Sequence, residues 1–151
     1  LNAEINSVLE ANRVTNINAG ITINWARSVI EKRSVTGAVD HIRDVSLAGM
    51  LSGIMFSGVT DRNDSEYGQW EDTHMPPARA FDVEYYEKGS LMTVENIEAS
   101  LVACDVKALD YIGIKLLAMP KDTLIERRVG LNRDAMKILD IVISRIHDTN
   151  V

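Results

Sequence analysis

Apolar residues recur at helical spacing through the first third of the chain. The 3.6-residue period runs through residues 5–12 and again through residues 23–30, with a break at residues 18–20. Ser34 and Thr36 are N-cap candidates, because a hydroxyl can accept a hydrogen bond from a free amide of the first helical turn. The pattern predicts N-terminal helices, with a turn near residue 34 and a further helix after it.

The middle of the chain has a mixed pattern. Residues 45–60 are too densely apolar for periodicity to decide between a buried helix and a pair of strands. Residues 58–77 are rich in glycine, proline, aspartate and asparagine and predict a loop. Residues 81–85 alternate apolar and acidic side chains, which is typical of a half-exposed strand. We therefore expect a small central antiparallel sheet around residues 46–87.

The last 60 or so residues return to helical patterning with clear punctuation. Thr93 can cap one helix, and Asp105 can cap a second that ends at Pro120. Gly130 is a C-cap candidate, after which Asn132 can start the final helix. The sequence predicts a helical C-terminal half.

These elements together predict a helix-rich α+β fold, with N-terminal helices, the small antiparallel sheet and the helical C-terminal half. A soft boundary near Gly89-Ser90 suggests two regions. The first, residues 1–89, would hold a helix and the sheet, and the second, residues 90–151, would be helical. One continuous domain is the alternative.

Composition narrows the class of protein. The chain has 151 residues, a net charge of −6 and one cysteine, which fits one globular domain without a disulfide framework. The longest uncharged stretch, residues 45–60, is shorter than the roughly 20 residues that span a bilayer. Residues 60–87 hold eight acidic and two basic residues, so the excess negative charge lies in this window and the rest of the chain is balanced. We expect no membrane contact, and the sequence favours neither virion nor cytoplasm.

The candidate chemistry of the chain is sparse. Glu71 and His74 have the ExxH spacing of a di-metal helix, but the sequence lacks the second ExxH that such a site needs. Phosphate loops, dinucleotide fingerprints and nucleophile elbows are absent from the sequence. His41 and His147 are expected on helix surfaces, and Cys104 is expected as a small core residue. We expect no catalytic residue, metal or cofactor, so the protein would not be an enzyme; a metal-dependent enzyme built on Glu71 and His74 is the weakest alternative.

Residues 124–139 resemble the DNA-binding helix-turn-helix in general form. A short helix, a turn at Gly130 and a longer helix space their apolar residues as that motif does. The resemblance implies that Asn132, Arg133 and Lys137 face the major groove, while Arg127 and Arg128 lie near phosphates. Ordinary packing of a helical hairpin is the favoured interpretation, and a DNA-binding regulator is the alternative function.

A second resemblance covers roughly residues 20–85. The run Tyr67-Gly68-Gln69-Trp70-Glu71, followed by residues 73–81 (Thr-His-Met-Pro-Pro-Ala-Arg-Ala-Phe), is similar to a run in the tailed-phage tail-completion and neck family. A helix and a Thr36-Gly37-Ala38-Val39 element precede it in the same order as in that family. The resemblance implies a small α+β subunit that forms rings at the head–tail joint without catalysis.

The functional hypothesis is therefore a non-enzymatic, self-assembling structural subunit, such as a phage virion or head–tail joining protein. Its partners would be further copies of the chain or neighbouring structural subunits, and nucleic acid only under the DNA-binding alternative. The aromatic, acidic and proline-stiffened segment is the expected contact surface. The residues expected at that interface are Tyr67, Trp70, Pro76, Pro77, Arg79, Phe81, Tyr85 and Tyr86.

Overall fold

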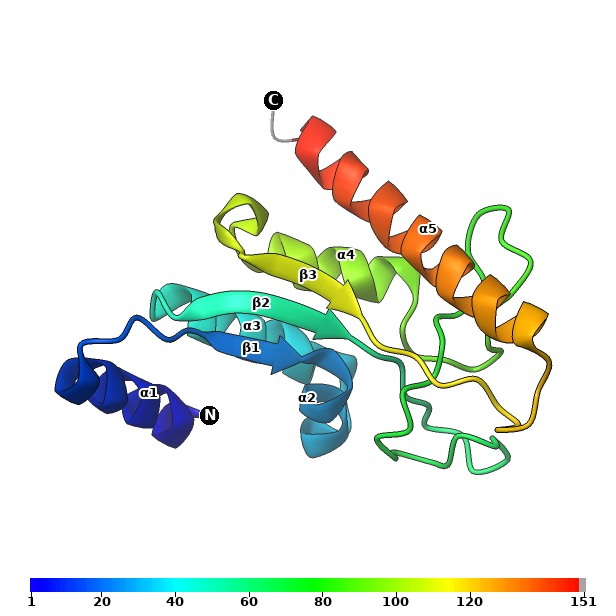
Figure 1. Ribbon diagram of the computed structural model, residues 1–151, viewed down its shortest axis with the longest axis horizontal. Coiled ribbons are helices and arrows are strands. Elements are labelled where there is room, and N and C mark those ends of the chain that lie inside the picture. Colours follow the sequence, from blue (N-terminus) through cyan, green and yellow to red (C-terminus); the bar gives the residue numbers. More distant parts are fainter. Residues whose placement is uncertain (150–151) are drawn as a thin grey trace.

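The computed structural model describes residues 1–149 and has a parallel three-stranded sheet at its centre. The strands are β1 (Ile21–Asn24), β2 (Leu51–Phe56) and β3 (Tyr111–Ile114), hydrogen-bonded in the order β1-β2-β3. The helices are α1 (Asn2–Thr15), α2 (Trp25–Lys32), α3 (Val35–Leu47), α4 (Val94–Val102), α5 (Ile125–Thr149) and the short 3₁₀ helix η1 (Val106–Ala108). Figure 1 shows their order along the chain.

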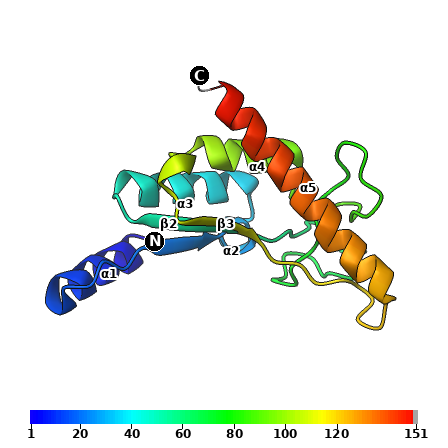
Figure 2. The ribbon, with the colours of Figure 1, turned by 45° about the horizontal axis from the view of Figure 1, so that its top comes forward.

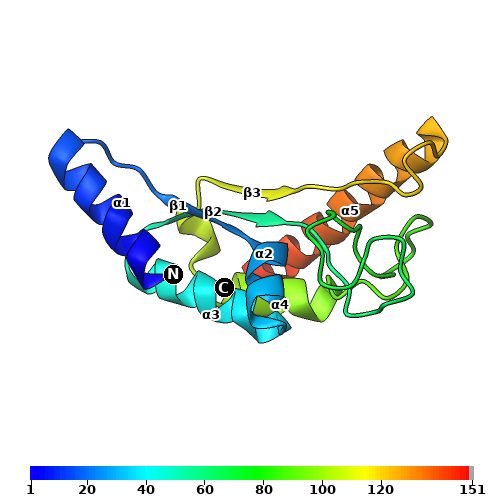
Figure 3. The same cartoon turned by 90° about the horizontal axis from the view of Figure 1, so that it is seen from below.

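All helices that cover the sheet lie on the same side of it. Figures 2 and 3 show α3 and α4 layered on one face, while the other face carries no helix within residues 1–149. Helix α5 packs against α4. The core lies between the sheet and this helical layer. In it Trp25 contacts Phe56, with ring centroids 6.5 Å apart, and its indole N–H donates to Ser100 Oγ at 2.9 Å.

The expected antiparallel sheet is wrong, because both strand pairs are parallel. Parallel neighbours need long crossovers, and here helices supply them: α2 and α3 join β1 to β2, and α4 with η1 joins β2 to β3. Residues 81–85, which were expected to form a strand, lie outside the sheet. The amides of Glu84 and Tyr85 donate instead to the Asp134 carboxylate on α5, at 2.9 and 2.8 Å.

Two strands occupy segments that were expected to be helical. The apolar positions of residues 23–30 fit one helix on paper, but Asn24 divides them: it ends β1, and its side chain accepts a hydrogen bond from Arg27 N to start α2. Residues 106–116 form η1 and β3 rather than a helix. Gly53, in the middle of β2, explains how β3 fits, because a Cβ there would lie 2.7 Å from the Tyr111 ring that crosses it.

Two local expectations are confirmed, because the side chains of Ser34 and Thr93 cap α3 and α4. In the stretch 45–60, where the sequence left helix and strand open, residues 51–56 form a strand. The soft boundary near residue 89 falls between β2 and β3, which belong to one sheet.

The helical hairpin expected within residues 124–139 is wrong. Helix α5 runs without interruption from Ile125 to Thr149, straight through Gly130. The glycine serves packing rather than a turn: a Cβ at position 130 would lie 2.5 Å from the Tyr85 ring. The ring therefore rests directly on the helix backbone. The geometric basis of the helix-turn-helix resemblance is absent.

We predict that Gly130→Ala destabilises the protein. An interior Gly→Ala change normally stabilises a helix by about 1 kcal/mol. Here the new methyl group would displace the Tyr85 ring, and such overpacking costs about 1–3 kcal/mol. The midpoint of urea unfolding should fall. In a Tyr85→Ala background the same change should be stabilising, and an equal gain in both backgrounds would contradict this account.

We predict that the Asp134 carboxyl makes the free energy of unfolding depend on pH. The hydrogen bond from Arg133 and those from the two backbone amides outweigh burial, so the pKa of the Asp134 carboxyl lies below its ordinary value. A carboxyl with a depressed folded pKa stabilises the fold above its unfolded pKa, about 3.9, and this contribution is lost as the pH falls through the folded pKa. Asp134→Asn should cost about 1–3 kcal/mol at pH 7.

Urea unfolding between pH 7 and pH 3 measures this effect. The stability difference between the wild type and Asp134→Asn should shrink at the acidic end. Asp140→Asn is the matched control, because Asp140 is exposed on the same helix. A constant difference across the pH range would rule out the Asp134 contribution.

Candidate active site at the carboxyl ends of the strands

Three polar residues follow the three strands and gather at one edge of the sheet. Asn24 ends β1, Ser57 follows β2 and Lys115 follows β3. Since the strands are parallel, their carboxyl ends meet there. The Ser57 hydroxyl, which is fully buried, donates to Asn24 Oδ1 at 3.4 Å, and Lys115 N donates to the Phe56 carbonyl at 2.8 Å. In parallel α/β proteins this is the edge at which ligands bind.

Two long connections cover this edge. Residues 57–93 lead from β2 to α4, and residues 115–124 lead from β3 to α5; Figure 1 shows both beyond the arrowheads of the strands. They are joined by hydrogen bonds, including Leu117 N to the His74 carbonyl at 2.8 Å. Loops fixed to a rigid sheet in this way are where binding and catalytic groups are usually found.

Tyr67 is the main link between the two connections. Its ring is buried, with 3% of the residue exposed. Its hydroxyl donates to the Leu117 carbonyl at 3.0 Å, with a Glu87 carboxylate oxygen at 3.3 Å, and accepts from Met119 N at 3.1 Å. Burial, together with the charge of Glu87, raises the pKa of the phenol, so it stays a neutral donor. Tyr67 holds both connections in one position.

A charged cluster lies within these connections. Arg27 Nε, on the first turn of α2, donates to Asp72 Oδ2 at 2.8 Å, and His74 Nδ1 lies 3.1 Å from Asp72 Oδ1. Burial raises the pKa of the Asp72 carboxyl. The hydrogen bond from Arg27 and the neighbouring charges of His74 and Lys115 outweigh burial and hold the pKa below its ordinary value. Asp72 is therefore an anion that is held by Arg27 and lies beside the His74 imidazole.

The backbone at His74 is strained. Its φ is +59°, and that of Trp70, four residues earlier, is +57°, a region that bulky residues rarely adopt. The Nδ1 atom of His74 is buried, and its approach to Asp72 does not have the angle of a hydrogen bond, so it has no hydrogen-bond partner within the described chain. Such strain concentrates at functional sites, where the surrounding structure compensates for it.

The uncovered face of the sheet leads to this cluster. Thr22 of β1 and Tyr111 of β3 join across Gly53 through their hydroxyl oxygens, 2.6 Å apart. Two residues further along their strands, Asn24 and Met55 lie on the same face as Thr22 and Gly53. Strand alternation places this face on the side of the sheet opposite the helices. The face thus presents hydroxyl and amide groups toward the strand ends.

The residues expected at an intersubunit surface are divided between the interior and the surface. Tyr67, Pro76 and Pro77 are buried, and Trp70, Tyr85 and Tyr86 are partly buried. Arg79 and Phe81 are exposed, but each meets a group of this chain. The Arg79 guanidinium lies 5.6 Å from the Tyr86 ring centroid, and that of Arg145 lies 4.7 Å from the Phe81 ring centroid. Most of the aromatic groups in this segment therefore stabilise the connections themselves.

The residues proposed to contact DNA are engaged within the chain. Arg127 pairs with Glu87, Arg133 with Asp134, and Lys137 with Asp82. Arg128 donates to the carbonyl oxygens of Lys121 and Thr123, and Asn132 donates to the Arg128 carbonyl. The contacts of Arg127, Arg128 and Lys137 fix α5 to the connections beside it, while those of Asn132 and Arg133 lie within the helix.

The structure also places the remaining sequence candidates. Glu71 and His74 lie in a connection, not on a helix, so their spacing does not put them on one helical face. His41 is buried, with 6% exposed and Nδ1 3.0 Å from Ser28 Oγ, so its expected surface position is wrong.

Among residues 1–149 there is no group of three acidic, histidine or cysteine side chains that could hold a metal ion. None of the described helices has the length and apolar character that a membrane crossing requires.

Comparison with known proteins identifies the family. Residues 1–131 match the model of a domain of unknown function, DUF4862, and the chain belongs to this family. Its relatives include the Uncharacterized protein STM3670 of Salmonella typhimurium strain LT2, which is 34% identical over 133 residues. These residues make up 88% of the chain but only 40% of that relative. No solved structure matches the chain significantly. Neither finding refers to phage proteins, so the tail-completion resemblance stays a prediction.

Sequence analysis missed Asn24, Arg27, Ser57 and Lys115 as site residues. The signal was present: each lies at or just after the carboxyl end of a short apolar segment. It was hidden because two of the three strands were interpreted as helix, and residues beyond strand ends only converge once the strands are known to be parallel.

We predict that Tyr67→Phe loosens the two connections without unfolding the sheet. The change removes one donor and one acceptor and leaves Leu117 O and Met119 N unpaired, which costs about 1–3 kcal/mol. Hydrogen exchange should quicken in residues 115–119 while the amides of β2 stay protected. Tyr86→Phe is the control, since no hydrogen bond of the Tyr86 hydroxyl is found within the described residues. Unchanged exchange at residues 115–119 would show that Tyr67 does not link the connections.

Proposed function

We propose that the edge formed by Asn24, Ser57 and Lys115, with Arg27, Asp72 and His74 above it, is part of an active site for proton transfer on a small anionic molecule. One observation carries the proposal: a carboxylate, an imidazole and a guanidinium meet at the carboxyl edge of a parallel sheet, on a strained backbone. The sequence favoured a non-enzymatic subunit because no set of catalytic residues was recognised in it, and this cluster is such a set.

The Asp72–His74 pair supports acid–base chemistry. A carboxylate beside Nδ1 favours the tautomer that is protonated there, which leaves Nε2 as the proton acceptor. The present 3.1 Å approach is poorly aligned, and catalytic hydrogen bonds of empty sites often tighten only when substrate binds. Asp72 would act as the positioning residue and His74 as the group that exchanges a proton with substrate.

The charges around the pair favour an anionic substrate. The Arg27 side chain is 70% exposed, so a ligand can approach it while Nε holds Asp72. The Lys115 ammonium forms no ion pair within 4 Å in the described part of the chain. A carboxylate or phosphate group between these two cations would gain charge-assisted hydrogen bonds.

Solvent-deuterium exchange tests the proposal. The chain and the full-length Salmonella relative are incubated in D₂O with sugar phosphates and hydroxy acids, and NMR follows the incorporation of deuterium at carbon. We expect incorporation for one class of anion and a loss of at least about 100-fold in rate for His74→Gln, since general acid–base catalysis contributes about 10²–10⁴-fold. Arg27→Gln should weaken binding about 10-fold to 100-fold, as expected for a charged hydrogen bond.

The control is Arg13→Gln, because Arg13 pairs with Glu10 on α1 and does not contact the cluster. Equal incorporation by the wild type and His74→Gln would refute a catalytic role. If both proteins bind the anion but neither exchanges protons, the edge is a binding site rather than an active site. Light scattering on the same samples tests the competing structural-subunit hypothesis, which requires a defined oligomer.

A further inference from the structure

Helix α5 has an apolar stripe on its outer side. Ile125, Val129 and Met136 are 71%, 61% and 49% exposed and follow one another at spacings of four and seven residues, which places them on one face. The opposite face buries Leu131, Ile138 and Val142, of which the latter two belong to the main core. Helix α5 therefore has two apolar faces, and the described chain covers only one of them.

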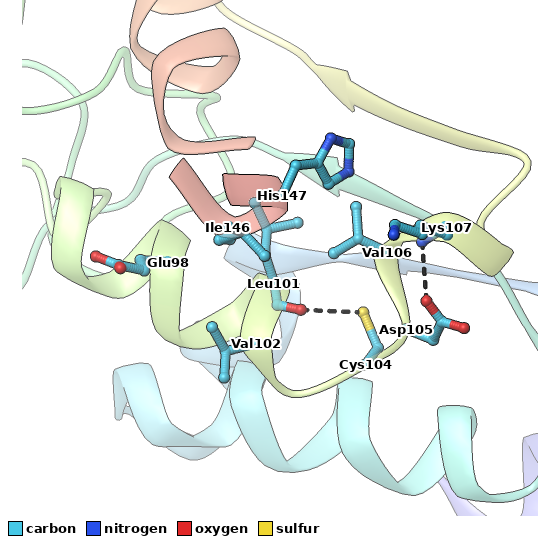
Figure 4. Close-up of a pocket in the computed structure, with 9 residues that line it drawn as sticks. All are labelled: Glu98, Leu101, Val102, Cys104, Asp105, Val106, Lys107, Ile146 and His147. Carbon is cyan, nitrogen blue, oxygen red and sulfur yellow. Dashed lines mark hydrogen bonds between the residues drawn. The ribbon is translucent and has the colours of Figure 1, made fainter. Parts of the chain in front are cut away.

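A cavity of about 520 Å³ lies at the other end of the same helix. Figure 4 shows it between α4, η1 and the last turns of α5, with Leu101, Val106 and Ile146 among the residues that line it. Val102, at its rim, is 66% exposed. The η1 residues that line the cavity directly precede the segment that leads into β3.

The outer edge of β3 completes this region. The strand order leaves β3 with one neighbour in residues 1–149, although its faces are apolar enough to be partly buried. An open edge beside exposed apolar side chains is a liability that proteins normally cover or blunt with charge.

The order of the strands indicates what covers them. Each crossover in the described chain adds the next strand on the same side and places its helices on the same face, without the reversal that puts helices on both faces of a doubly wound sheet. Repetition of this step produces a closed β/α barrel. The Salmonella relative is about two and a half times as long as its matched segment, so it has ample chain for further units.

We propose that in the longer polypeptides of this family a further strand pairs in parallel with β3, and that the helix after it packs on the Ile125–Val129–Met136 stripe. The occupant is thus a β-strand and an amphipathic helix of the same polypeptide, with apolar side chains toward α5. Helix α5 would then contact a helix on each side, as helices do in such barrels. This proposal does not depend on the chemistry proposed for His74.

Cysteine labelling tests the proposal. A Cys104→Ser background carries either Val129→Cys or Asp44→Cys, the latter at an exposed position on α3. Both variants are made in the 151-residue chain and in a chimera. In the chimera this chain replaces the matching segment of the full-length Salmonella relative. Maleimide should label position 129 at least about tenfold more slowly in the chimera than in the chain alone, while position 44 reacts equally in both. Equal rates at position 129 would overturn the proposal.

A second measurement does not require the chimera to fold. Hydrogen exchange in the full-length Salmonella relative should be slow through the segment aligned with β3, and faster at the corresponding amides of the 151-residue chain. Equally fast exchange in both would overturn the proposal. A discrete dimer of the 151-residue chain that protects position 129 would also overturn it, because the stripe would then be covered by a second copy.

Discussion

The parallel pairing of β2 with both of its neighbours is the constraint on which the rest of the structure depends. It requires a long crossover between each pair of strands, and these crossovers supply the helices that cover one face. It also brings three carboxyl ends to a single edge. Were either pair antiparallel, Ser57 would lie at the opposite end of the sheet from Asn24 or from Lys115. The three polar residues would then no longer gather beside the charged cluster.

The contacts that position the two connections at this edge also hold the strained backbone of His74. The connections after β2 and β3, residues 57–93 and 115–124, contain no helix or named strand, so their backbone groups must find partners in each other. Tyr67 and the Leu117–His74 hydrogen bond provide them. A histidine with a positive φ costs free energy, and only an environment that is tied down on several sides holds it in place. Rigidity of the connections thus allows a strained His74 to face Asp72.

Much of the local structure could be predicted from the sequence, since it depends on neighbouring residues. The caps at Ser34 and Thr93 and the loop character of residues 58–77 follow from side chains that satisfy nearby backbone groups. The strands do not follow in this way, because a four-residue strand such as β1 is too short to show an alternation that differs from one helical turn. Without the strands, their parallel direction could not be predicted either. The continuity of α5 was hidden for a related reason. Gly130 is required by Tyr85, a contact 45 residues distant in sequence that no local pattern reveals.

The one-sided arrangement of helices connects the proposed site with the uncovered surface of α5. A sheet whose helices all lie on one face leaves its other face open, and here that face carries the polar groups of Thr22, Tyr111 and Asn24 beside Met55. Closing the sheet into a barrel would turn this polar face inward and place it below Asp72 and His74. The same closure would bury the edge of β3 and the stripe on α5. Polar residues on the open face and apolar residues on the outer helix, which conflict in an open sheet, are both consistent with such a barrel.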